Sequence, residues 1–290
     1  MIVRIFQGPG NQMFQLAYGL AASMRMNTSL KLDLSWFRKN SGHRAYILDH
    51  FKHDLPIATD EDIRRAKVCY AETRVRLTAN QLCNWVAPRH KKSVVVERLD
   101  DYDSPLLYPN PKAYITGYFT SESFFQSHEN LVRSTLTYTK PLSNQSKAVQ
   151  NDMRKGGAVA LSVRRGDFVN NPLHDVCGLD YFERAISWME NRFENLHFYV
   201  FSDDLPWVSE NLKLPRNKTI MDFNSPNYME DLFLMTQCSH HIIPNSTFSW
   251  WGAWLANDPN QTVIAPKRWL GGSNVYYDHV VPNRWVQLEN

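Results

Sequence analysis

Two arginines and an aspartate directly follow an apolar run at residues 158–163. The run ends in Ser162-Val163, and Arg164-Arg165-Gly166-Asp167 comes next. A guanidinium group binds phosphate through paired hydrogen bonds, so these arginines are candidates for holding an anionic ligand. Side chains alternate along a strand, which places Ser162 with Arg164 on one face and Arg165 with Asp167 on the other. We therefore expect one arginine to address a ligand and the other to pair with Asp167. The alternative is a purely structural Arg–Asp pair.

A second polar cluster, Asn245-Ser246-Thr247-Phe248-Ser249, stands between an apolar run and Trp250-Trp251-Gly252. A strand that enters a helix through such a turn leaves the amides of the first helical turn without acceptors. Together with the helix dipole, these amides attract anions such as phosphate. The cluster is a candidate phosphate site, and the alternative is an ordinary helix cap followed by buried tryptophans.

Acidic and imidazole side chains elsewhere do not form a credible metal site. Ser202-Asp203-Asp204 precedes Leu205-Pro206-Trp207, and Ser and Asp are preferred N-caps, so capping is favoured over metal binding. Cys238-Ser239-His240-His241 matches no zinc spacing, and adjacent strand residues point to opposite faces. The sequence also lacks a phosphate-binding P-loop and a complete dinucleotide fingerprint.

Strands and helices must position these groups, and their pattern predicts an α/β fold. Apolar runs predict strands at residues 2–6, 30–34, 158–163, 196–202, 219–222, 240–244 and 262–265, and helical spacing predicts helices at 13–24, 179–193 and 228–238. Such runs are typical of parallel strands that are buried on both faces. Ligands of these sheets lie beyond the carboxyl ends of the strands, where both polar clusters stand. Residues 36–114 lack a clear pattern, and we expect short helices and insertions there.

The length of 290 residues predicts two domains. The polar turn at 140–146, a helix to Lys155 and the pair Gly156-Gly157 mark the boundary between them. We expect one domain at residues 1–150 and a second at 151–290, each an α/β layer, facing one another across a cleft.

Composition excludes several classes of protein. The chain is 43% hydrophobic and 21% charged, as in soluble globular proteins, and its net charge of +3 is too small to indicate a nucleic-acid partner. It shows neither a stretch of about 18 apolar residues nor a signal peptide, so we expect no transmembrane segment. Four widely spaced cysteines fit a reduced, cytoplasmic chain: Cys69, Cys83, Cys177 and Cys238.

Several motifs together resemble the inverting α-1,2-fucosyltransferases of the bacterial type, glycosyltransferase family 11. The family's Gly-Leu-Gly-Asn-Gln-Met-Phe-Gln stands here as Gly8-Pro9-Gly10-Asn11-Gln12-Met13-Phe14-Gln15, and its His-x-Arg-Arg-x-Asp as Ser162-Val163-Arg164-Arg165-Gly166-Asp167. Its Gly-Tyr-Trp-Gln-Ser-Glu is similar to residues 117–122, and its Phe-Ser-Asp-Asp matches residues 201–204. Its C-terminal signature is similar to Asp231-Leu232, His240-His241-Ile242-Ile243 and residues 245–254. The motifs follow the family's order over most of the chain.

The resemblance implies a GT-B-like fold of two Rossmann-like domains, an acceptor-side domain first and a GDP-sugar domain second. It implies transfer of L-fucose from GDP-β-L-fucose to the 2-hydroxyl of a galactose-type acceptor in a surface glycan. No metal or other cofactor is implied, and the place of action is the cytoplasm or the inner face of the membrane. The expected catalytic residues are Arg164, Asn11 and Asp167. The expected donor-binding residues are Ser162, Arg164, Ser202, Asp203, Asp231, Asn245, Ser246, Thr247 and Phe248.

Among these residues, the resemblance assigns Arg164 to the β-phosphate, the Ser246–Phe248 loop to the diphosphate, Asp231 to the guanine edge and Asn11 to the fucose. The charge of the leaving group supports the two phosphate assignments. GDP leaves as a multiply charged anion, and without a metal an arginine and backbone amides must stabilise that charge.

Ser162 stands where the family carries His, and this departure keeps other functions open. They are a transferase for another GDP-sugar and a catalytically silent module that binds a GDP-sugar or a glycan. The transfer also requires a base for the acceptor hydroxyl. Asp167, Glu122 and His174 are the candidates, each with a structural role as the alternative.

Overall fold

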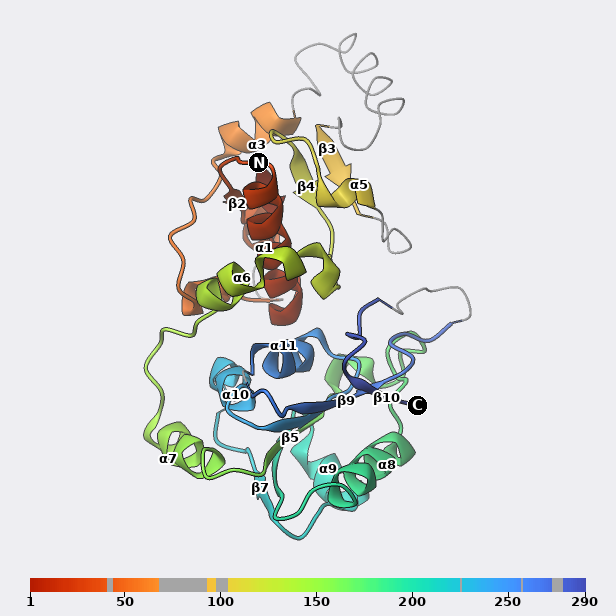
Figure 1. The fold of residues 1–290 in the computed structure, drawn as a ribbon. Helices are drawn as coiled ribbons and strands as arrows, with labels where there is room; N and C mark the ends of the chain where they lie inside the picture. The colour runs from red at the N-terminus through yellow and green to blue at the C-terminus, as the bar shows by residue number, and fades with distance from the viewer. Residues whose placement is uncertain (41–43, 68–92, 98–103, 225, 257, 273–278) are drawn as a thin grey trace. The chain divides into compact units, whose positions relative to one another are not determined.

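The computed structural model describes residues 1–40, 44–67, 93–97, 104–224, 226–256, 258–272 and 279–290 (Figure 1). The chain divides into two compact units, Met1–Thr139 and Lys140–Asn290. This division precedes helix α7 (Asn144–Met153), whereas the sequence-based boundary at residue 150 falls inside that helix. The helix belongs to the second unit because Met153 packs in that unit's core and Ser143, at its N-cap, donates to Glu230.

The first unit contains a parallel sheet with strand order β2-β1-β4-β3. Its strands are β1 (Ile2–Arg4), β2 (Lys31–Asp33), β3 (Val94–Val96) and β4 (Tyr114–Thr116). The long helix α1 (Pro9–Arg25) connects β1 to β2, which confirms the β-α-β unit predicted at the start of the chain.

Short helices accompany this sheet, and those within residues 36–114 were expected from the sequence. They are α2 (Ser35–Lys39), α3 (Asp60–Lys67), α5 (Ser104–Leu107) and α6 (Glu129–Thr135), with 3-10 turns η1 (Leu48–His50), η3 (Glu122–Phe124) and η4 (Gln126–His128). The region also supplies β3 and β4, which the sequence did not predict. Much of it, at 41–43, 68–92 and 98–103, lies outside the described residues.

The second unit contains a parallel six-stranded sheet with strand order β10-β9-β8-β5-β6-β7. Its strands are β5 (Ala158–Val163), β6 (His197–Ser202), β7 (Lys218–Ile220), β8 (His240–Ile242), β9 (Thr262–Pro266) and β10 (Val286–Leu288). The sequence predicted all of these strands except β10. The helices besides α7 are α8 (Leu179–Glu190), α9 (Leu205–Asn211), α10 (Tyr228–Met235) and α11 (Thr247–Leu255).

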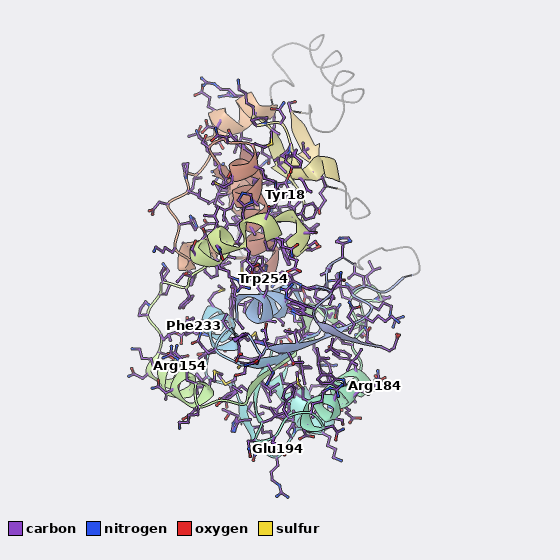
Figure 2. All side chains as sticks on the ribbon, in the orientation of Figure 1. Tyr18, Arg154, Arg184, Glu194, Phe233 and Trp254 are labelled. Carbon is purple, nitrogen blue, oxygen red and sulfur yellow. The ribbon has the colours of Figure 1, made fainter. Side chains whose placement is uncertain are left out.

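Helices cover both faces of this sheet (Figure 1). Val159, Leu161 and Val163 of β5 pack with residues of α8 and α9, whereas Ala158 and Ala160 pack with residues of α7 and α10. Both faces of β5 are therefore buried, which explains its unbroken apolar sequence. Phe233 of α10 and Trp254 of α11 are labelled in Figure 2.

The helices and cysteines of the structure bear on two expectations from the sequence, the absence of a transmembrane segment and the presence of reduced thiols. In the described part of the chain no helix combines the length and apolar character needed to span a bilayer. Cys177 and Cys238 are free thiols, and Cys238 is buried; Cys69 and Cys83 lie outside the described residues.

Candidate functional site

The direction of strand connection in the second unit reverses between β5 and β8. After β5 the chain adds β6 and β7 on one side of that strand, and then returns to place β8 on the other side of β5. Ligands of open parallel sheets bind beyond the carboxyl ends of the strands at such a switch point. Arg164 follows β5 there, Asp203 follows β6, and Asn245 lies three residues after β8.

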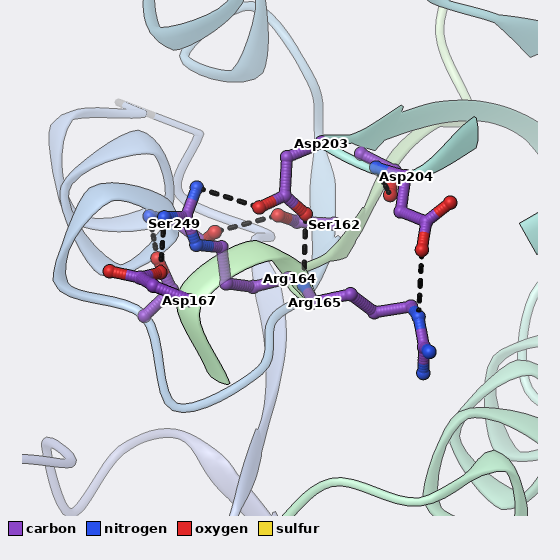
Figure 3. Close-up of polar contacts among 9 residues, drawn as sticks. Ser162, Arg164, Arg165, Asp167, Asp203, Asp204 and Ser249 are labelled. Carbon is purple, nitrogen blue, oxygen red and sulfur yellow. Dashed lines mark hydrogen bonds and ion pairs between the residues drawn. The ribbon is translucent and has the colours of Figure 1, made fainter. Parts of the chain in front are cut away.

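Arg164 is held between two carboxylates at this edge (Figure 3). Its Nη1 lies 2.9 Å from Oδ2 of Asp203, and its Nη2 lies 2.6 Å from Oδ1 of Asp167. The guanidinium carbon also lies 5.6 Å from the centre of the Phe168 ring. The arginine is thus oriented in advance on the side of the sheet where a ligand is expected.

The expectation that Asp167 pairs with Arg165 is wrong, because Asp167 pairs with Arg164. Strand β5 ends at Val163, and Gly166–Phe168 forms a 3-10 turn (η5), so the strand alternation does not extend to Asp167. Arg165 instead binds Asp204, and its guanidinium lies 3.6 Å from the Trp207 ring centre.

The backbone near Arg164 is fixed by Asp203. Oδ1 of Asp203 accepts a hydrogen bond of 2.8 Å from the amide of Arg165. A Cβ atom at Gly166 would collide with Oδ2 of the same carboxylate, so only glycine permits this approach. Asp203 therefore positions Arg164 both through its ion pair and through the following peptide.

Ser202 and Asp204 shape the start of α9. The hydroxyl of Ser202 accepts from the amide of Asp204 at 3.0 Å, and Asp204 caps α9 by accepting from the amide of Trp207 at 3.2 Å. This confirms the capping role predicted for the Ser-Asp-Asp segment.

Helix α11 presents its N-terminus at the same edge. Ser246 caps the helix, and the first backbone bond within it runs from Trp250 to Ser246. Within the described ranges, the amides of Thr247 and Phe248 have no acceptor. These amides and the helix dipole have the geometry that the sequence-based hypothesis of an anion-binding turn requires.

The tryptophans that follow belong to the core. Trp250, Trp251 and Trp254 are at most 2% exposed. Trp250 also donates from Nε1 to the carbonyl of Val280 at 2.8 Å. They anchor α11 and are not a surface for stacking of sugar or base.

Ser162 lies beneath the first turn of α11. Its hydroxyl is 2.6 Å from that of Ser249, and both side chains are buried. Asn245 is buried as well: its amide nitrogen donates to the carbonyl of His174, and its amide oxygen accepts from the thiol of Cys177. Ser162 and Asn245 therefore fix the Ser246–Ser249 turn in place.

His174 is held by stacking against Phe168, with ring centres 4.9 Å apart. Because Phe168 also lies beside Arg164, this stack forms one support of the arginine.

Asp231 lies in the first turn of α10 and is half-buried. The ring of Tyr228, which begins this helix, lies 6.1 Å from the ring of Phe248, so α10 and α11 start side by side. Burial raises the pKa of Asp231 to about 6, and the neighbouring Glu230 acts in the same direction. A hydrogen bond of 2.6 Å from Asn224 opposes this shift.

Asn11 lies in the first turn of α1, in the other unit. Gln12 and Gln15 of the same motif serve the backbone. Gln12 binds the carbonyls of Gln7 and Ala45 and the amide of Ile47, and Gln15 accepts from the amide of Phe6. Among the described residues, the side-chain amide of Asn11 has no hydrogen-bond partner. This side chain is half-exposed. The motif thus builds a fixed turn that presents Asn11.

Sequence reasoning brought most of the site to one edge but missed several residues. Ser162, Arg164, Asp167, Ser202, Asp203, Asp231 and Asn245–Phe248 all belong to the second unit, whereas Asn11 and Glu122 belong to the first. The missed residues are Gly166 and Asn224, and the contact of Ser249 with Ser162 was not predicted, although Ser249 belongs to the polar cluster named above. Gly166 was visible as the only glycine beside the arginines, but Asn224 carries no local signal. In the part of the chain that the structure describes, no group of three His, Cys, Asp or Glu side chains is arranged to hold a metal.

The sequence profile of glycosyl transferase family 11 matches residues 7–288. The chain belongs to this family. Membership of this family identifies the chain as a glycosyltransferase, as the motifs predicted.

Two bacterial relatives align over nearly all of the chain. An alpha-1,2-colitosyltransferase of Escherichia coli is 29% identical over 100% of this chain and 99% of its own length. The O-antigen biosynthesis glycosyltransferase WbnK of Escherichia coli is 27% identical over 97% of this chain and 98% of its own length.

The fold resembles that of a solved fucosyltransferase. NodZ from Bradyrhizobium aligns with a TM-score of 0.50 at 12% identity, covering 87% of this chain and 91% of NodZ. This likeness, with the parallel sheets described above, confirms the α/β, GT-B-like fold.

Proposed function

We propose that this family 11 glycosyltransferase moves L-fucose from GDP-β-L-fucose to the 2-hydroxyl of a galactose-type acceptor in a surface glycan, with inversion. The bond between the sugar C1 and the phosphate oxygen breaks, a bond from the acceptor O2 to C1 forms, GDP leaves and the acceptor proton passes to a base. The observation that carries the proposal is Arg164 and the α11 amides at one sheet edge, in a chain of this family.

The proposed donor site assigns a role to each group. Arg164 and the amides of Thr247 and Phe248 stabilise the charge that develops on the leaving diphosphate. Asp231 accepts from the N–H groups of guanine, and Asn11 binds the sugar. No metal is required in this scheme, because the arginine and the helix N-terminus supply the positive potential.

A second donor is supported by a specific comparison. The relative with 29% identity over the whole chain is a colitosyltransferase, and colitose is L-fucose without its 3-hydroxyl. GDP-colitose is therefore the alternative donor for the same reaction.

Product analysis tests the proposal. The protein is incubated with a β-galactoside and GDP-fucose, GDP-colitose or GDP-mannose, and the linkage and anomeric configuration of the product are determined by NMR. We expect an α-1,2-linked product from a 6-deoxy-L-sugar donor. Transfer from GDP-mannose alone refutes the donor assignment. Binding of GDP without turnover of any donor supports a silent binding module instead.

A further inference from the structure

The charges around Arg164 do not favour a diphosphate in the conformation that the structure shows. Arg164 and Arg165 contact three carboxylates, those of Asp167, Asp203 and Asp204. The net formal charge of this cluster is therefore minus one. A diphosphate adds further negative charge, so its binding to Arg164 is favoured when one of these carboxylates withdraws.

Asp203 is not the group that withdraws. One of its oxygens binds Nη1 of Arg164 and the other accepts from the amide of Arg165. Its side chain is 26% exposed and lies directly against Gly166. Moving Asp203 would break the contacts that shape the end of β5.

Asp167 is placed to withdraw. It lies in the three-residue turn η5, and its side chain is 53% exposed. An exposed carboxylate that leaves an arginine is rehydrated by water, so this ion pair contributes little net free energy. The contact to Nη2 of Arg164 is the one that a phosphate oxygen can replace at the lowest cost.

We propose that Asp167 is an internal competitor for the phosphate, which occupies Nη2 of Arg164 in the free protein and yields it when the diphosphate binds. This inference rests on the proposed function. Asp167 keeps Arg164 extended without ligand, and by returning to it after transfer it weakens the hold on GDP. Asp167 is a positioning residue in this scheme. While it is bound to Arg164, its carboxylate is not available as the base.

Calorimetric binding of GDP to Asp167→Asn tests the inference, since this change keeps the size of the side chain and removes its charge. We expect GDP to bind about three- to tenfold more tightly, as expected for removal of one exposed competing charge. The KM for the donor falls in parallel, and kcat does not rise. Asp203→Asn is expected to weaken GDP binding, because asparagine has one acceptor oxygen and cannot hold both Nη1 of Arg164 and the amide of Arg165.

Asp180→Asn is the matched control, since Asp180 forms an exposed ion pair with Arg184 in the same unit. It should leave GDP affinity unchanged. Asp167→Ala serves as a second variant, and thermal unfolding verifies that each protein is folded. If wild type binds GDP but Asp167→Asn and Asp167→Ala bind it equally or more weakly, the competitor role is refuted. If wild type does not bind GDP, the proposed function itself fails.

Discussion

The hydroxyls of Ser162 and Ser249 lie 2.6 Å apart and are shielded from water. Ser162 is on the strand that leads to Arg164, and Ser249 is in the first turn of the helix with the unpaired amides. This single hydrogen bond therefore joins the two halves of the proposed phosphate site. It also explains how serine fills a position where the motif of related sequences has histidine.

Replacing Ser162 by His is expected to damage the site. The imidazole is larger than the buried space beside Ser249, and overpacking of this kind costs about 1–3 kcal/mol of stability. We expect a lower unfolding temperature and weaker GDP binding, because the start of α11 is displaced. Ser209→His, at an exposed position of α9, is the control and should change neither. A Ser162→His protein with unchanged stability and tighter GDP binding would show that the pocket admits the imidazole.

Arg164→Ala is expected to lower kcat/KM far more than Arg165→Lys. The Arg164→Ala protein would lose a contact that strengthens as charge develops on the leaving group. This loss should cost about 2–4 kcal/mol in transition-state stabilisation. Arg165 faces Asp204 and Trp207 instead, so its replacement by Lys should cost about 1 kcal/mol of folding stability and little activity. Steady-state kinetics and thermal unfolding of both variants provide the measurement. Equal loss of activity in the two would contradict the assignment.

The comparison of Arg164 and Arg165 shows the limit of prediction from sequence. The apolar run at 158–163 predicted β5 with its observed bounds, because a strand buried on both faces needs apolar residues throughout. The face of each arginine could not be predicted, since alternation holds only while the strand continues. The turn η5 reverses the expected pairing of Asp167.

Three short strands and one side-chain hydrogen bond also could not be predicted from the sequence. Strands β3, β4 and β10 have three residues each and stand in no run that the sequence marks as a strand. The equally short β1, β2, β7 and β8 lie in such runs, at 2–6, 30–34, 219–222 and 240–244. The contact of Asn224 with Asp231 depends on how α10 packs after β7. No pattern in the sequence around Asn224 indicates that its amide holds a carboxylate.

GDP is expected to stabilise the protein without added metal. Arg164 and the α11 amides supply the anion-binding groups, so the ligand needs no bridging cation. At a concentration of about 100 times Kd, GDP should add about 2.7 kcal/mol to the free energy of unfolding. Thermal unfolding with and without EDTA is the measurement. A shift that requires Mg²⁺ or Mn²⁺ and disappears with the chelator would contradict this expectation.

Asp231→Asn is expected to weaken GDP binding and to reduce the preference for GDP over ADP. A carboxylate accepts from both N–H donors of the guanine edge, whereas an amide leaves one of them mismatched, at a cost of about 1–3 kcal/mol. Calorimetry with GDP and ADP measures both effects. Retention of the full preference for GDP in the variant would place base recognition elsewhere.

The same residue makes the stability of the free protein depend on pH. The pKa of Asp231 is about 6 in the folded chain against 3.8 in the reference state, so the folded chain binds the proton more tightly. Its contribution therefore destabilises the fold progressively as pH rises from about 4 to 6, and is constant above that range. The difference in unfolding free energy between wild type and Asp231→Asn should shift against wild type across this interval. A flat difference would contradict the raised pKa.

Gly252→Ala is expected to disturb the packing of α10 against α11. A Cβ atom at Gly252 would lie 2.8 Å from Cβ of Met235, a contact closer than real Cβ atoms make. The two helices must then separate, at a cost of about 1–3 kcal/mol in stability. Because Asp231 and the α11 amides are on these two helices, GDP binding should weaken in the same variant.

The double variant Gly252→Ala with Met235→Ala distinguishes this mechanism from a general loss of stability. Removing the Met235 side chain beyond Cβ frees space into which α10 can adjust, so the double variant should recover part of the GDP affinity relative to Gly252→Ala. Met235→Ala alone removes a buried side chain and is expected to cost about 2–5 kcal/mol in stability. The four proteins form a thermodynamic cycle, measured by thermal unfolding and GDP calorimetry. Strict additivity of the two substitutions would show that the Gly252–Met235 contact does not set the distance between the helices.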